Sequence, residues 1–148
     1  MSAHIVTTIF STSRRVFQAS DMTSEELIAE IKSQCVAEKG KYDWLDEVID
    51  EIIGNAEELI TNFPSDDILE NVDVMFISDD HHDGYIHELY VTCKNPELNG
   101  LGFSLDDMSC GVGNCDGDSF FNAHFSSRPM REIAFEVYST IKQHMVKW

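Results

Sequence analysis

Residues 72–93 constrain the fold more than any other stretch, because two runs of strand-forming residues flank a short polar turn. The run 72–78 is rich in Val, Phe and Ile, and the run 85–92 is rich in Tyr, Ile and Val. Between them, Asp83-Gly84 favours a tight turn, since glycine adopts positive φ without steric cost. The pattern predicts an antiparallel β-hairpin in the middle of the chain.

Helical patterns lie on both sides of this hairpin. Thr23 and Glu26 have the spacing of a capping box at the start of a first helix, and Gly40 marks its end. A second helix is expected over 43–62, where apolar residues recur at helical spacing. Pro129 follows two serines and precedes a third apolar stripe, which predicts a closing helix.

Further strands are expected at 3–18, as one long or bent strand, and at 101–105 and 119–125, with a loop over 106–118. The resulting element order is β-α-α-β-β-β-β-α. This order predicts an α+β fold in which helices pack on one face of an antiparallel sheet of about four strands. The length of 148 residues fits a single domain, 1–148.

Charge is distributed very unevenly along the chain. The formal net charge is −17, and residues 42–118 contain 20 acidic residues against one basic residue, Lys94. Such a field repels nucleic acids and anionic membranes and attracts basic proteins. We therefore expect no direct binding to nucleic acid or to membranes.

The four cysteines and the N-terminal segment indicate a compartment. No apolar run approaches the length of a membrane span, and the first residues lack the basic and apolar regions of a signal peptide. We therefore expect a cytoplasmic protein, as monomer or homodimer, with four reduced thiols and no cofactor.

The acidic residues of the second helix and of the neighbouring loops are the main candidates for a binding surface. The pairs Asp46–Asp50 and Glu47–Glu51 place like charges one turn apart, which costs about 0.2–0.5 kcal/mol each. A sequence that tolerates this repulsion indicates that the face serves a partner. The expected partner-binding residues are Asp46, Glu47, Asp50, Glu51, Glu57, Glu58, Asp66, Asp67, Asp79, Asp80 and Asp83.

These features favour an inhibitor that occupies the basic surface of a nucleic-acid-binding or nuclease partner. Carboxylates one helical turn apart, about 5–6 Å, approach the spacing of phosphates along a strand. A nucleic-acid mimic that blocks restriction or CRISPR enzymes, or an immunity protein for a toxin nuclease, would work in this way. An acidic regulatory adaptor for another kind of partner is an alternative.

A small metal- or cysteine-dependent enzyme using loops 79–88 and 106–124 is the other alternative. Imidazoles and thiolates are zinc ligands, and a thiol beside an imidazole can act as a nucleophile. A structural zinc site normally needs four ligands in close pairs, and this sequence offers no such pattern. The candidate ligands are His81, His82, Cys110, Cys115 and His124.

Overall fold

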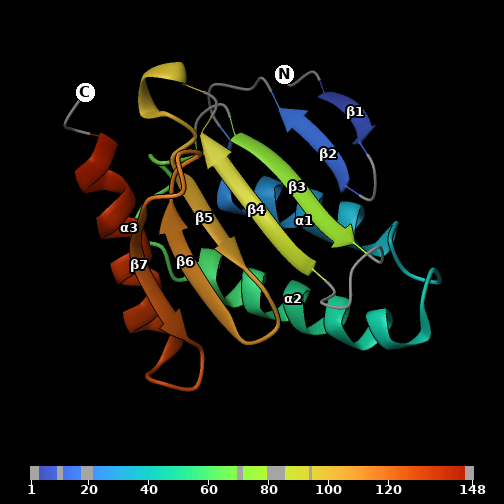
Figure 1. Ribbon diagram of the computed structural model, residues 1–148. Helices are drawn as coiled ribbons and strands as arrows, with labels where there is room; N and C mark the ends of the chain where they lie inside the picture. The colour runs from blue at the N-terminus through green and yellow to red at the C-terminus, as the bar shows by residue number, and fades with distance from the viewer. Residues whose placement is uncertain are drawn as a thin grey trace.

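The fold is an antiparallel sheet of seven strands, in the order β1-β2-β3-β4-β5-β6-β7, with three α-helices (Figure 1). The structure is a computed structural model that describes residues 4–9, 12–17, 22–69, 72–79, 86–93 and 95–145. For β1, β2 and positions 78, 79 and 86 the backbone alone is described. The strands are β1 (His4–Ile9), β2 (Thr12–Phe17), β3 (Val72–Asp79), β4 (Ile86–Cys93), β5 (Gly102–Leu105), β6 (Ser109–Gly113) and β7 (Ser119–His124).

The predicted hairpin is confirmed and lies in the middle of this sheet. Strands β3 and β4 pair antiparallel over their whole length, from Val72 opposite Cys93 to Asp79 opposite Ile86. The turn that joins them lies outside the described residues. Strand β2 pairs with the other edge of β3, although two helices separate them in the sequence. The hairpin thus provides the two strands on which the remaining five assemble.

The helices α1 (Ser24–Val36), α2 (Asp43–Thr61) and α3 (Met130–Met145) cover one face of the sheet (Figure 1). The capping box predicted for α1 is present: Thr23 Oγ1 accepts from the Glu26 amide at 3.1 Å, and the Thr23 amide donates to the Glu26 carboxylate at 3.0 Å. None of the helices described is both long and apolar enough for a bilayer crossing. The α+β fold with helices on one face is therefore as predicted.

The core lies between the sheet and the helices. On β3, Val72, Val74 and Phe76 are buried, and Phe76 is paired with buried Leu89 of β4. From the helix layer, α2 contributes its apolar stripe. Phe63, just after α2, contacts Phe103 edge to face, with 5.6 Å between the ring centroids. The buried residues of the α2 stripe are Leu45, Ile49, Ile52, Ala56, Leu59 and Ile60.

Two expectations about the strands are wrong in detail. The segment predicted as one strand over 3–18 contains two paired strands, β1 and β2. The predicted loop 106–118 contains β6, which pairs with both β5 and β7. The sheet consequently has seven strands and not about four. Glycines and serine supply most of β6, and these residues have low strand propensity, so pairing on both edges decides its conformation.

Gly54 offers a test of the helical conformation of α2, because it is an exposed residue in the middle of this helix. A Cβ added there would meet no atom within 4 Å. Gly54→Ala should raise the free energy of unfolding by about 0.5–1 kcal/mol, since alanine loses less backbone entropy in a helix. Denaturant unfolding measures this change.

Gly40 is the matched control, because it is equally uncrowded but has a φ of +88°. Gly40→Ala should destabilise the protein by about 1–2 kcal/mol, since an L-residue is strained in this conformation. If the two substitutions changed the free energy of unfolding equally, the difference in backbone conformation between Gly54 and Gly40 would be contradicted.

Candidate functional site

The outer face of α2 presents the acidic residues that the sequence analysis expected at a binding surface. The buried stripe of α2 faces the sheet, so the residues between its members point away from it. Asp50, Glu47, Glu51, Glu57 and Glu58 are exposed, and Asp46 is half-buried. The expectation that these carboxylates share one accessible helix is confirmed, whereas their binding to a partner stays a prediction.

Half of these six carboxylates have a partner within the chain. Lys32 of α1 approaches Glu57 at 3.1 Å, and Lys39, from the turn after α1, forms an ion pair with Asp50. Asp46 accepts a hydrogen bond of 3.0 Å from the Gly40 amide. These contacts connect the two neighbouring helices and reduce the charge that the three residues present to a partner.

The two acidic residues of the loop after α2 also have structural roles. Asp66 accepts hydrogen bonds from the backbone amide and the hydroxyl of Ser24, at the start of α1. Asp67 accepts from the Tyr138 hydroxyl at 2.7 Å and forms an ion pair with Lys142, both on α3. The hydrogen bond from Lys142 is the main reason that the pKa of Asp67 lies below its ordinary value. The loop is thereby fastened to two helices.

Three carboxylates remain, Glu47, Glu51 and Glu58, which we call the acidic row. All three are exposed, and in the part of the chain that the structure describes none of them forms an ion pair. Their spacing of four and seven residues places them within a narrow sector of the helix surface. The acidic row is the portion of the expected binding surface that has no described internal role.

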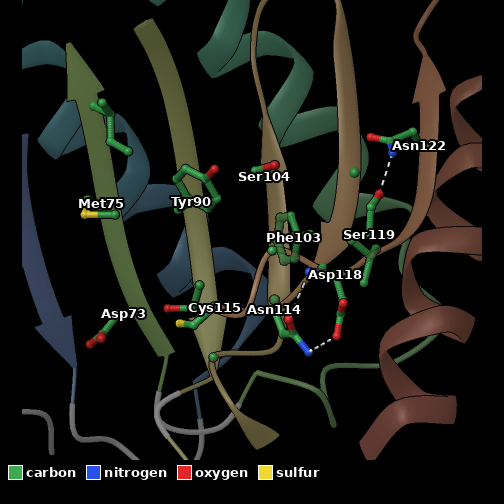
Figure 2. Close-up of a pocket in the computed structure, with 18 residues that line it drawn as sticks. Asp73, Met75, Tyr90, Phe103, Ser104, Asn114, Cys115, Asp118, Ser119 and Asn122 are labelled. Carbon is green, nitrogen blue, oxygen red and sulfur yellow. Dashed lines mark hydrogen bonds between the residues drawn. The ribbon is translucent and has the colours of Figure 1, made fainter. Parts of the chain in front are cut away.

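A second candidate site lies on the opposite face of the sheet, which the described helices do not cover. There the side chains of β3 to β7 and the loop 114–119 surround a hollow of about 600 Å³ (Figure 2). We call it the sheet hollow. Met75, Ile77 and Tyr90 contribute apolar surface on one side, and Asn122 and Asp118 lie on the other.

Small residues on β5 and β6 create this hollow. Gly102, Ser104, Gly111 and Gly113 line it, so two adjacent strands present almost no side chain there. Glycine is required at 102 and 113, because a Cβ would lie 2.2 Å from the Val91 carbonyl oxygen and 2.4 Å from the Asp118 carbonyl oxygen, respectively. Glycine at these positions thus allows neighbouring polar groups to approach the strand backbone closely.

Tyr90 and the polar groups around the hollow are held in place by hydrogen bonds. The Asn114 side chain accepts from the Asp118 amide at 3.3 Å, and Ser119 bonds to Asn122 at 2.6 Å (Figure 2). Burial is the main cause of the raised pKa of Tyr90, and the neighbouring Glu88 raises it further. Tyr90 therefore keeps its proton and donates to Glu88.

The cysteines fall into different environments. Cys35 and Cys110 are buried in the core, and burial raises the pKa of Cys35 to about 12 and that of Cys110 to about 11. Cys115 is exposed at the edge of the sheet hollow, where its sulfur lies directly over Gly100. Cys93 is half-buried. A buried, protonated thiol is a poor nucleophile and a poor metal ligand.

The residues considered for metal binding or catalysis are not brought together. Cys110 points into the core, Cys115 borders the hollow, and exposed His124 bonds to Ser126 at 2.7 Å. Across the described ranges no three potential ligands form a cluster. His81, His82, Asp80 and Asp83 lie outside the described residues, and of Asp79 only the backbone is described.

Sequence reasoning missed the sheet hollow. The available signal was the alternation in 102–113, where glycine or serine alternates with Phe103, Leu105, Cys110 and Val112. That alternation marks strands with one buried face and one nearly bare face. Gly102 falls in a strand as expected, whereas Gly111 and Gly113 instead favoured a loop over 106–118.

Comparisons with protein families, with curated proteins and with solved structures gave no match for this chain.

The environments of the thiols predict a clear order of reactivity. Native protein treated with iodoacetamide near neutral pH should be alkylated at Cys115 well before Cys35 or Cys110, because burial protects the latter two and keeps them protonated. Peptide mass spectrometry over time measures each site. Unfolding in denaturant should remove the difference, and equal native rates would contradict the described burial.

The contacts of Asp67 predict a pH-dependent contribution to stability. Asp67→Asn should lower Tm by a few degrees near neutral pH, since a partly exposed ion pair contributes modestly. A carboxylate with a lowered pKa stabilises the fold above its ordinary pKa of 3.8, and this contribution disappears as pH falls through the lower folded value. The difference from the parent protein should therefore vanish in acid.

Lys142→Met provides the control for this interpretation. It should cause a similar loss, and the double variant should be less destabilised than the sum of the two single variants. Additive effects would contradict a direct Asp67–Lys142 interaction.

Proposed function

We propose that this chain is an acidic binding protein that occupies the basic surface of a nucleic-acid-binding or nuclease partner. The observation that supports the proposal best is the acidic row of Glu47, Glu51 and Glu58. These carboxylates are exposed and have no described ion pair, although Lys32 of α1 and Lys39 of the following turn pair with Glu57 and Asp50 of the same helix. Among the expected residues whose side chains the structure describes, the proposal narrows the binding surface to these three.

The row suits this role because it sits on a rigid support. Helix α2 is anchored by six buried residues, so the backbone that carries the carboxylates is fixed by the core. Along the axis, Glu47 and Glu51 are separated by about 6 Å and Glu51 and Glu58 by about 10 Å. A line of negative charge at these intervals can pair with the lysines and arginines that normally contact a nucleic-acid backbone.

The electrostatic setting supports rapid association with such a partner. The chain carries a formal net charge of −17, and exposed like charges at Glu47 and Glu51 raise the local negative potential. Complementary fields steer encounter, and their effect decreases as salt screens them. Binding through the row should therefore weaken strongly with ionic strength.

The variant Glu47→Gln with Glu51→Gln tests the proposal. Binding to a basic partner captured from a lysate should weaken by about three- to thirty-fold, because each exposed charge pair contributes up to about 1 kcal/mol. Stability should be unchanged or rise by about 0.2–0.5 kcal/mol, since the repulsion within the pair is removed. Affinity at two salt concentrations and a melting curve give both quantities.

The matched control is Glu97→Gln with Glu132→Gln, which removes two exposed charges away from α2. It should bind nearly as well as the parent chain. The parent should also displace nucleic acid from the captured partner. Equal binding by both double variants would contradict the role of the row, and binding without displacement would favour the adaptor alternative.

A further inference from the structure

Trp44 lies on the same side of α2 as the acidic row and extends its line toward the start of the helix. The row occupies positions 47, 51 and 58, so Trp44 precedes its first member by three residues. Spacings of three, four and seven residues return to nearly the same side of a helix that has about 3.6 residues per turn. One stripe of α2 thus carries an indole followed by three carboxylates.

The indole of Trp44 is held in a cluster of three rings. Its centroid lies 5.6 Å from that of the Tyr42 ring, with 18° between the two planes, and 5.6 Å from that of His87 on β4. These contacts come from the residue before α2 and from the sheet, so they fix the position of the indole. Trp44 is nevertheless 38% exposed. A rigidly held aromatic side chain that remains accessible is typical of the anchors of protein interfaces.

We propose that the partner of the acidic row is a protein that binds single-stranded nucleic acid, and that Trp44 takes the place of an unstacked base. This inference rests on the proposed function and adds the class of the partner. In a single strand the bases are accessible beside the phosphates. Proteins that bind single strands combine a basic groove with aromatic or arginine side chains that stack on those bases. A stripe that joins carboxylates to an exposed indole offers both features to such a groove.

A duplex-binding partner fits this stripe less well. Such a protein contacts phosphates and reads base edges from the grooves, because the faces of the bases are stacked inside the duplex. Carboxylates alone would satisfy its phosphate-contacting lysines and arginines, and the indole would have no counterpart. In a single-strand site, an aromatic ring or a guanidinium of the partner covers the exposed part of Trp44.

The indole and the carboxylates are close enough to lie under one partner. Along the axis of α2, Trp44 and Glu47 are separated by about 4.5 Å, and the whole stripe from Trp44 to Glu58 covers about 21 Å. An interface of standard size covers about 800 Å² of each partner, which corresponds to a patch about 30 Å across. A single interface can therefore cover the whole stripe.

Two synthetic peptides test the chemistry of the stripe without the natural partner. They are equal in length and charge, but one alternates arginine with tyrosine and the other alternates arginine with serine. The full chain should bind the arginine-tyrosine peptide about five- to ten-fold more tightly, since only this peptide provides rings that can contact Trp44. Calorimetric titration at low salt measures both affinities.

Substitutions of Trp44 should change this preference in a graded way. Trp44→Leu should remove most of the difference between the peptides, because leucine is apolar but has no ring. Trp44→Phe should retain most of it, and melting curves of both variants verify folding. Phe120→Leu is the matched control, since Phe120 is 37% exposed and its ring stacks on His144 at 3.8 Å, but it lies on β7. It should leave the preference unchanged, and an equal loss in this control would contradict a specific role of Trp44.

The variant Glu47→Gln with Glu51→Gln separates this inference from the proposed function. It should weaken binding of both peptides by a similar factor and preserve the ratio of their affinities, because it changes charge alone. Unchanged affinity for both peptides would contradict the proposed function. Preservation of the ratio in Trp44→Leu would contradict only the role of Trp44.

The class of the partner is tested with the protein that the parent chain captures from a lysate. A single-stranded oligonucleotide should displace the chain at a lower phosphate concentration than a duplex of the same sequence. Trp44→Leu should weaken binding to this protein about five- to fifty-fold, the range expected for the loss of one stacking contact. Displacement by the duplex at the lower concentration would assign the row to a duplex-binding partner, which overturns this inference and leaves the proposed function intact. Displacement by neither nucleic acid would overturn both.

Discussion

The packing of all three helices on one face of the sheet is the constraint on which the other features depend. Side chains alternate along a strand, so Val72, Val74 and Phe76 enter the core while Asp73, Met75 and Ile77 face the other way. The buried face gives the fold its stability through the contact with α2 and its neighbours. The opposite face is consequently available to form the sheet hollow, and its composition is not governed by contact with the helices.

Packing against the sheet also divides α2 into a buried apolar face and an exposed acidic face. Its buried stripe is fixed by the sheet, and its outer face carries carboxylates that repel one another. Lysines from α1 and the turn after it offset part of this repulsion at Glu57 and Asp50, but the described contacts leave Glu47, Glu51 and Glu58 exposed. Within the described part of the chain, the charged part of the proposed binding surface therefore consists of the three carboxylates that have no internal ion pair.

Local patterns predicted most of the fold because they reflect local physics. The capping box at Thr23 and Glu26 and the apolar stripe of α2 depend on residues within one or two helical turns of each other. The hairpin depends on one tight turn and the two strands that flank it. Strand β6 could not be recognised with equal ease. Glycines at 111 and 113 favour no strand, and only pairing with β5 and β7 makes the segment extended.

The sequence by itself determined the α+β class, the starts of the helices, the central hairpin and the concentration of acidic residues between 42 and 118. These follow from periodicity, capping and composition, which act over short distances. Tertiary structure alone decided which carboxylates are neutralised, since Lys142 reaches Asp67 across 75 positions and Lys32 reaches Glu57 across 25. It also created the sheet hollow, because a concave face exists only after the five consecutive strands from β3 to β7 have paired side by side.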